Sequence, residues 1–297
     1  MPKVISFSAL SLLFVACSSK TAPVEATAAE EVEAEVPAEA PAAEPTSSVT
    51  AAADVQWMPA NPEMPEGPHL AVIEGNMKEG AFSALVKLPA GHASPLHSHP
   101  AGFSGVVISG TVHNGRTADD YIEIGVGSTW TEPANEVHFT GCAEGADCVF
   151  VAHMDGAMGM TPAEAPTEGD MQMVFTAAAD LPYAAVNPEM PEGPQMYVIG
   201  GDRSSGPFHA LVKFPAGMTS PEHSHSATYS GAVVSGEMSH GGPDTQGVGS
   251  VWTEVGGTPH VTGCVSEEPC SFFVSMAGAF SMTPTAPAEA PEAPAAE

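Results

Sequence analysis

The chain contains a sequence repeat whose two copies are similar over long segments. Residues 91–110 read GHASPLHSHPAGFSGVVISG and residues 217–236 read GMTSPEHSHSATYSGAVVSG, at a constant offset of 126. The segment NPEMPEGP at 61–68 returns at 187–194 with the same offset. Because the period exceeds a hundred residues, it indicates two copies of a whole domain rather than a solenoid of short repeats.

Each copy is predicted to fold as a series of short strands. In the first copy these are HLAVIEG, AFSALVKLP, FSGVVISGTVH, YIEIG, STWTE, VHFTG and CVFVAHM. Gly, Pro and acidic turns separate the runs, and no helical period is sustained over three turns. Many short strands at close spacing favour a sandwich or barrel. The sequence therefore predicts two all-β domains, residues 53–160 and 174–284, with 161–173 as the linker.

Both copies contain a His-x-His pair and a third histidine in a second repeated motif, GSTWTEPANEVHFTGC or GSVWTEVGGTPHVTGC. The six residues are His97, His99 and His138 in the first copy and His223, His225 and His260 in the second. Side chains at i and i+2 of a strand share a face, so each pair can form one edge of a metal site. Solvent-facing histidines are the alternative. Three histidines at matching places in both copies favour two metal sites.

The N-terminus carries a targeting signal. In residues 1–16, Lys3 precedes an apolar run that is too short to span a bilayer. The run ends in FVAC, which resembles the lipobox of bacterial lipoproteins, although Phe14 stands where Leu is usual. Cys17 is then expected to carry lipid, and Ser18 resembles the sorting signal for the outer membrane, facing the periplasm. An ordinary secretory peptide that leaves Cys17 as a free thiol is the alternative.

The other four cysteines stand in two C-x5-C pairs at corresponding places. The pairs are Cys142 with Cys148 and Cys264 with Cys270. In an exported chain, an even number of cysteines at repeated spacing predicts disulfides. Each pair flanks a turn between two apolar runs, so each bond is expected to close a hairpin and contribute about 2 kcal/mol of stability. A thiolate metal site is the alternative.

Composition identifies the remaining segments and excludes one class of function. Residues 17–52 and 285–297 are rich in Ala, Pro and Glu, a composition that cannot bury enough apolar area to fold alone. We expect a disordered tether and a disordered tail. The whole chain has a net charge of −29 with only seven Lys and Arg. Such a surface repels nucleic acid, so nucleic-acid binding is excluded.

The spacing of glycines and histidines resembles the two motifs of the cupin superfamily. The matching residues are Gly91, His97, His99, Gly110, Gly127, Pro133 and His138, and then Gly217, His223, His225, Gly236, Gly249, Gly257 and His260. NPEMPEGP and the cysteine pairs further resemble a poorly characterised cupin-like family related to the sensor cupins of zinc-binding anti-sigma factors. The resemblance covers both repeats. It implies a bicupin, with a double-stranded β-helix (jelly-roll) in each half and the histidines at the barrel mouth.

Departures from the cupin pattern bear on the metal. The Glu that usually follows the His pair is Phe103 in one copy and Tyr229 in the other, and the usual second-motif Gly is Asn135 in the first copy. Three neutral imidazoles with open coordination positions suit zinc, iron, copper or nickel. Loss of the carboxylate removes charge that would favour manganese. The predicted cofactor is therefore a divalent transition metal.

Four residues are candidates for binding a small ligand in the barrels: Lys87, Lys213, Phe103 and Tyr229. The two lysines share one strand position and could hold an anionic ligand, or they could face solvent. Tyr229 could donate a proton or a hydrogen bond, or it could be a packed aromatic side chain. The sequence leaves these alternatives open.

Two functions follow from this pattern. One is a tethered module that binds or senses a metal and a small ligand, which the missing cupin Glu and the lack of an obvious general acid or base favour. The other is a metal-dependent enzyme such as a three-histidine oxygenase, because open metal positions can activate oxygen or water. The second rests on fold analogy, which does not establish chemistry. The sequence indicates no particular oligomeric state.

Overall fold

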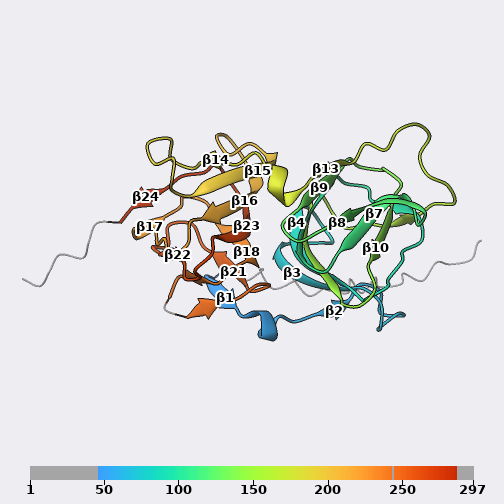
Figure 1. Cartoon of the computed structure of the whole chain (residues 1–297), viewed down its shortest axis with the longest axis horizontal. Helices are drawn as coiled ribbons and strands as arrows, with labels where there is room; N and C mark the ends of the chain where they lie inside the picture. The colour runs from blue at the N-terminus through green and yellow to red at the C-terminus, as the bar shows by residue number, and fades with distance from the viewer. Residues whose placement is uncertain (1–45, 243, 286–297) are drawn as a thin grey trace, which may run out of the picture. The chain divides into compact units, whose positions relative to one another are not determined.

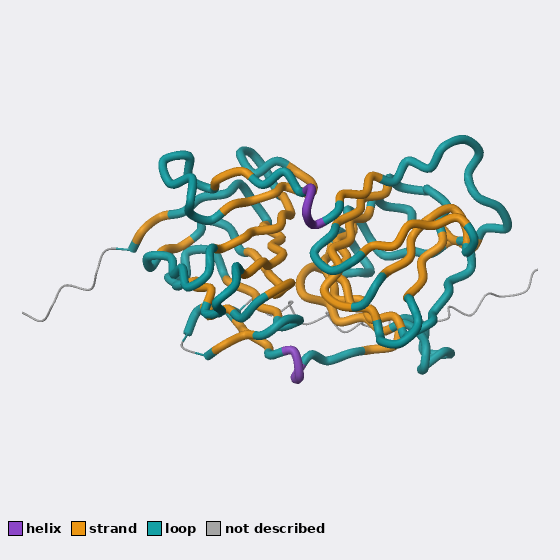
Figure 2. Tube along the Cα trace, viewed as in Figure 1, coloured by secondary structure: helices purple, strands orange, loops and turns teal. Residues whose placement is uncertain are grey.

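The computed structural model describes residues 46–242 and 244–285, which belong to one compact unit and contain two β domains (Figure 1). Within the described residues there is no α-helix, and the two helical turns are 3-10, η1 (Ala52–Asp54) and η2 (Ala178–Asp180) (Figure 2). The all-β prediction is confirmed. The predicted signal peptide, Cys17, most of the predicted tether and residues 286–297 of the predicted tail lie outside the described part. No helix of the described part is long and apolar enough to cross a bilayer.

The first domain is a jelly-roll of two main sheets. Its larger sheet runs in the order β13 (Val174–Thr176), β9 (Thr129–Glu132), β6 (Phe103–Ser109), β11 (Cys148–Met154), β4 (Phe82–Leu88), β3 (His69–Gly75) and β2 (Met58–Pro59). Its smaller sheet is β10 (Phe139–Cys142), β7 (Val112–Thr117) and β8 (Asp120–Ile124). A short pair, β5 (His97–Ser98) with β12 (Thr161–Pro162), completes the domain.

The second domain repeats this architecture. Its larger sheet runs in the order β1 (Ser48–Thr50), β21 (Val251–Glu254), β18 (Tyr229–Ser235), β23 (Cys270–Met276), β16 (Phe208–Phe214), β15 (Gln195–Gly201) and β14 (Ala184–Ala185). The smaller sheet is β20 (Thr245–Gln246), β19 (Met238–His240) and β22 (Thr262–Cys264), and β17 (His223–Ser224) pairs with β24 (Thr283–Pro284). The duplicated sequence therefore folds into duplicated structure.

The central strands are apolar on both faces because each face meets a different core. In β4, Phe82 and Ala84 point into the barrel of the first domain, whereas Leu85 joins an apolar cluster shared by both domains. Glycine admits the largest barrel side chain: a Cβ on Gly105 would lie 2.3 Å from the ring of Trp130. Buried on both sides, these strands show little of the alternation that marks a half-exposed sheet.

Each large sheet receives an edge strand from the segment that precedes the other domain. β1 pairs with β21 of the second domain before the chain enters the first, and β13 pairs with β9 of the first domain before the chain enters the second (Figure 1). Two predicted boundaries therefore differ from the structure. The predicted tether to residue 52 includes β1, and the segment assigned to the second domain begins with β13. Both segments are held by hydrogen bonds to a sheet that is distant in the sequence. Amino-acid composition does not predict such pairing.

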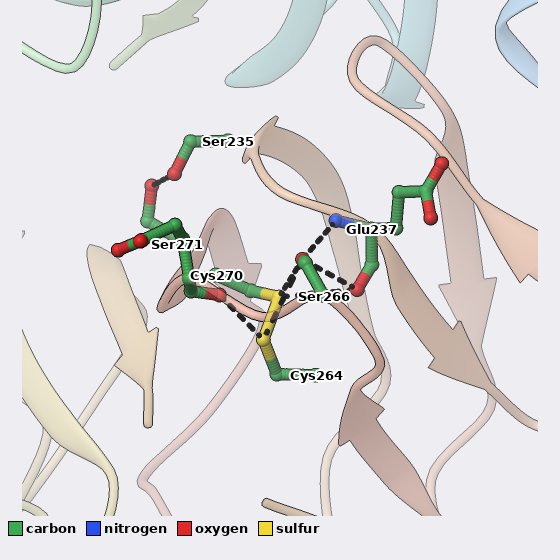
Figure 3. Close-up of a disulfide and its surroundings, with 7 residues drawn as sticks. Ser235, Glu237, Cys264, Ser266, Cys270 and Ser271 are labelled. Atoms are coloured by element: carbon green, nitrogen blue, oxygen red, sulfur yellow. Dashed lines mark hydrogen bonds between the residues drawn. A yellow bond between two sulfur atoms is a disulfide. The ribbon is translucent and has the colours of Figure 1, made fainter. Parts of the chain in front are cut away.

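The two predicted disulfides are present, Cys142–Cys148 and Cys264–Cys270. The predicted hairpins are wrong. β10 pairs with β7 while β11 pairs with β4 and β6, so the first bond joins the small sheet to the large one. The consecutive strands β10 and β11 therefore belong to different sheets. At the second bond, the Ser266 hydroxyl lies 3.3 Å from Sγ of Cys270 and accepts the backbone N–H of Glu237 at 2.8 Å (Figure 3).

The large sheets of the two domains share an apolar cluster that ends in a polar edge. Its buried members include Leu85, Val106 and Val151 of the first domain and Leu211, Ala232 and Phe273 of the second. At the edge, the rings of His153 and His209 stack with centroids 4.1 Å apart, and Nε2 of His209 lies 3.0 Å from the hydroxyl of Ser104. The hydroxyl of Ser275 donates to the half-buried carboxyl of Glu74. Polar groups thus join the domains where the apolar contact stops.

Deleting β1 should weaken the second domain. Removing residues 1–51 takes away the edge strand of its large sheet, and a few net hydrogen bonds at about 1 kcal/mol each should lower the free energy of unfolding by about 2 kcal/mol. Removing residues 1–45 alone keeps β1 and is the matched control. Urea unfolding of the two shortened chains measures the difference. Equal midpoints would show that β1 contributes nothing.

Acid should loosen the contact between the domains through His209. Burial and the nearby His153 lower the pKa of His209 from 6.5 to about 3. The unfolded chain therefore takes up a proton first as the pH falls below 6.5, and stability is lost between that pH and about 3. His153, Asp155 and Glu74 are the other titratable groups at this edge.

The test replaces His209 by Ser, the residue at the matching position in the first domain, and by Asn, which keeps a donor toward Ser104. Both changes should reduce the loss of stability on acidification by up to about 1.4 kcal/mol per pH unit. Chemical denaturation between pH 7 and pH 4 gives the slope. A wild-type slope in both variants contradicts the assignment.

Candidate metal centres

The backbone places the third histidine of each set beside the His-x-His pair. The N–H of His97 donates to the carbonyl of His138 at 3.0 Å, and the N–H of His138 donates back at 2.8 Å. His223 and His260 are joined in the same way, at 3.0 and 2.8 Å. Residues opposite each other in an antiparallel bridge present their side chains on the same face. Motifs about 40 residues apart therefore meet at one point.

The six predicted histidines come together as two triples. One ring nitrogen of each histidine lies within 4.8 Å of those of its two companions, and all except the half-buried His99 are buried. Ring centroids are 4.4 to 5.3 Å apart in the first triple, His97, His99 and His138, and 4.4 to 5.2 Å apart in the second, His223, His225 and His260. The two centres thus have the same geometry.

Hydrogen bonds to the backbone fix how each ring presents its nitrogens. The Nδ1 acceptors are the carbonyls of Pro95, Gly159 and Glu136 for the first triple, at 2.9, 2.6 and 3.1 Å, and of Pro221, Ser281 and Thr258 for the second. A carbonyl only accepts, so each Nδ1 carries the proton and each Nε2 keeps its lone pair. Three inward lone pairs of this kind fit a transition-metal ion.

A buried carboxylate stands behind the first triple. Oε2 of Glu132 lies 2.8 Å from Nδ1 of His138, and Nδ2 of Asn114 donates to Oε1 of Glu132 at 2.8 Å. Glu132 was not identified from the sequence as a residue of the metal centre. The repeated TWTE and VWTE segments carried the signal, because Glu132 lies two residues after the core residue Trp130 and so points to the same face.

The second triple has different neighbours. His240 stands at the position of Asn114, and its Nε2 lies 3.4 Å from both Oε2 of Glu254 and the hydroxyl of Tyr229. That hydroxyl is 3.0 Å from Nε2 of His260. At the matching place in the first domain, the ring centroid of Phe103 is 6.4 Å from that of His138. The structure therefore places both aromatic candidates against the histidines, and it adds a fourth histidine at the second centre.

Comparison of the sequence with models of protein families identifies the family of this chain. Residues 48–210 and 183–296 match the model described as "Domain of unknown function (DUF4437)". The chain belongs to the DUF4437 family. No curated protein sequence matches this DUF4437 chain significantly.

Solved structures similar to the DUF4437 chain have the cupin fold. A candidate dioxygenase from Nostoc punctiforme is 14% identical, with a TM-score of 0.63 over 82% of this chain and 87% of that protein. Oxalate decarboxylase from Lactobacillus farciminis is 14% identical, with a TM-score of 0.52 over 82% and 90%. AerE from Microcystis aeruginosa is 13% identical, with a TM-score of 0.50 over 77% and 98%. The cupin fold is confirmed; kinship with anti-sigma sensor cupins stays a prediction.

Burial favours the neutral form of most imidazoles in the two histidine triples of the DUF4437 chain. Burial, helped by the charge of His138, lowers the pKa of His97 to about 4, and burial likewise lowers the pKa of His260 to about 4. Burial also lowers the pKa of His99, His223 and His225. Burial opposes protonation of His138 too, but the hydrogen bond and charge of Glu132 outweigh it and raise the pKa. Neutral imidazole is the form that binds a metal.

Asn135 takes over the glycine position of the second cupin motif. It has a φ of 65°, and its counterpart Gly257 has a φ of 87°. Asn is one of the few residues with a side chain that tolerate this left-handed region. The N–H of each residue donates at 2.7 Å to a carbonyl in the His-x-His pair, that of His99 or His225. The departure from the family pattern therefore preserves the turn that holds the pair.

The two lysine candidates lie away from the centres. Lys87 alternates with Val86 and Leu88, which face the barrel core, and its Nζ lies 4.6 Å from the ring centroid of Trp57. Lys213 is exposed, with Nζ 6.0 Å from the ring centroid of Tyr183. Strand parity puts both on the face opposite the histidines. An anionic ligand held in the barrel by these lysines is therefore contradicted.

Replacing Glu132 by Gln should weaken metal binding at the first centre. The carboxylate supports His138, and loss of such a partner typically costs about 10- to 100-fold in metal affinity. A competition titration against a chelator, carried out in a His223→Ala chain, isolates this centre. Glu254→Gln in a His97→Ala chain is the matched control, and its effect should be smaller because Glu254 contacts His240, outside the triple. Equal effects would refute this role for Glu132.

Proposed function

We propose that this protein is a bicupin of the bacterial envelope that binds one divalent transition-metal ion in each domain and holds a small ligand there. It acts as a binding or sensing module. The observation that carries the proposal is the pair of histidine triples with every Nδ1 hydrogen-bonded to a carbonyl. Each triple is preset to coordinate a metal through Nε2.

The donor set supports zinc, iron, copper or nickel. Three neutral nitrogen ligands with open positions suit all four ions, and they lack the carboxylate that would favour manganese or magnesium. At both centres the nearest buried carboxylates, Glu132 and Glu254, contact a histidine rather than joining the triple. A bound metal would supply Lewis acidity, and the chain's own groups would set which ligand reaches it.

The arrangement of these carboxylates also favours binding over catalysis. A general acid or base must reach the proton that it transfers. Glu132 is engaged by His138 and Asn114, and Glu254 by His240 and Ser47. Neither carboxylate is free to act on a ligand beside the histidines. Without such a group, we propose that the centres hold their ligand without turnover.

A metal-dependent enzyme is the second candidate. The Tyr229 hydroxyl lies 3.0 Å from Nε2 of His260, so the second centre has a polar group that could act on a bound molecule. The Nostoc punctiforme structure described as a candidate dioxygenase shares the fold at 14% identity, which supports the architecture and not the reaction.

The proposed location rests on the N-terminal sequence. The short apolar run and FVAC, with Cys17, support export and lipid attachment, and Ser18 supports the outer membrane, facing the periplasm. The two disulfides suit an oxidising compartment. The tether would let the metal-binding domains reach away from the membrane surface.

Metal content tests the proposal directly. Element analysis of the full chain with Cys17→Ser, which prevents lipidation, should find about two metal ions per chain, the number of three-ligand centres. His97→Ala and His223→Ala should each lose about one ion, and the double variant both, because two histidines hold a metal poorly. Unchanged content in all variants would remove the assigned ligands. Iron that also binds oxygen surrogates would favour the enzyme.

A further inference from the structure

We propose that the second barrel binds an apolar small molecule with one oxygen-bearing end, which lies against Tyr229 and the histidine triple. The apolar part of the molecule lies in a cavity that extends from these residues into the core of the second barrel. This inference names the ligand class for the second centre, so it rests on the proposed function.

A cavity of about 340 Å³ reaches from the second centre into the barrel. His223, His225 and Tyr229 line one end. The inner faces of β16 and β23 form its walls through residues such as Val212 and Val274. The metal-binding side chains therefore line a partly open pocket that extends into the barrel core.

The walls of this cavity are apolar and adaptable. Five methionines line it: Met190, Met196, Met218, Met276 and Met282. Four phenylalanines join them: Phe208, Phe214, Phe272 and Phe280. None of the described lining residues is Asp, Glu, Lys or Arg, although the chain contains 36 acidic residues. Methionine side chains are flexible and polarizable, so such a wall accepts apolar molecules of varied shape.

The polar groups in the lining are mostly engaged within the protein. The Ser220 hydroxyl accepts the backbone N–H of Thr262 at 3.0 Å, and the Thr262 hydroxyl lies 2.9 Å from Nδ1 of His240. The Tyr229 hydroxyl lies 3.0 Å from Nε2 of His260, the nitrogen that a bound metal would occupy, so metal binding would leave this hydroxyl free to donate elsewhere. An oxygen atom of a ligand bound at this centre would find Tyr229 as its hydrogen-bond donor.

The first barrel offers a natural contrast. Phe103 replaces Tyr229, His92 replaces Met218 and Ala152 replaces Val274 at the matching positions. A ligand that needs a hydroxyl donor beside the histidines therefore matches the second barrel better. The duplication supplies a matched control site in the same molecule.

The volume sets the expected size of the ligand. It equals about eleven water molecules at about 30 Å³ each, which corresponds to a chain of about ten carbon atoms with its polar end. Each methylene that enters an apolar wall contributes about 0.8 kcal/mol, or about fourfold in affinity. Affinity should therefore climb along a homologous series and then level off.

The test titrates straight-chain carboxylic acids, from acetic to dodecanoic acid, into the metal-loaded full chain with Cys17→Ser. Straight-chain alcohols form a parallel series that shows whether the end must carry charge. We expect calorimetry to give a rise of about fourfold per carbon up to about ten carbons. Tyr229→Phe should lower the affinity of all members by about tenfold, the effect of one hydrogen bond. Affinity that does not change with chain length overturns the inference.

Cavity-filling variants locate the binding site. Val212→Phe should shorten the longest chain accepted, and Val274→Phe is a second variant in case the first does not fold. Val86→Phe, at the position matching Val212 in the first barrel, should leave the series unchanged. Equal effects of Val212→Phe and Val86→Phe would overturn the assignment to the second barrel.

Metal analysis of the same samples separates the two proposals. Two bound ions with flat chain-length dependence would overturn the ligand class and leave the proposed function standing. Chain-length dependence without metal in either centre would overturn the proposed function and keep the apolar site.

Discussion

The metal centres depend on six hydrogen bonds from imidazole Nδ1 to backbone carbonyls. In four of the six histidines the acceptor lies two residues earlier in the chain, so the local backbone conformation fixes the ring. His99 and His225 instead reach the carbonyls of Gly159 and Ser281, next to the strands β12 and β24 that close each domain. The segments that close each domain therefore also orient the rings of His99 and His225.

Duplication kept this frame and changed what surrounds it. Both triples have nearly the same ring separations, yet Asn114 and Phe103 at one centre become His240 and Tyr229 at the other. The change moves the buried carboxylate's contact from His138 to His240 and brings a phenol hydroxyl next to His260. A common scaffold thus supports two centres with different hydrogen-bonding chemistry.

Exchange of edge strands makes the two domains depend on each other. β1 precedes the first domain but completes the large sheet of the second. β13 precedes the second domain but completes the large sheet of the first. The shared apolar cluster and the His153–His209 stack add contacts between the large sheets. Because the faces that meet are the outer faces of the barrels, this contact leaves the interior of each barrel to the histidines and any ligand.

The sequence alone determined the duplication, the all-β class, the disulfide partners and the six histidines, because each leaves a periodic or repeated pattern along the chain. Only the tertiary structure decided the rest. It placed the lysines outside the barrels, put Glu132 and His240 behind the histidines, and joined β10 and β11 to different sheets. It also moved β1 out of the predicted tether. These features depend on which distant strands pair and which face a side chain takes, and local spacing does not encode either.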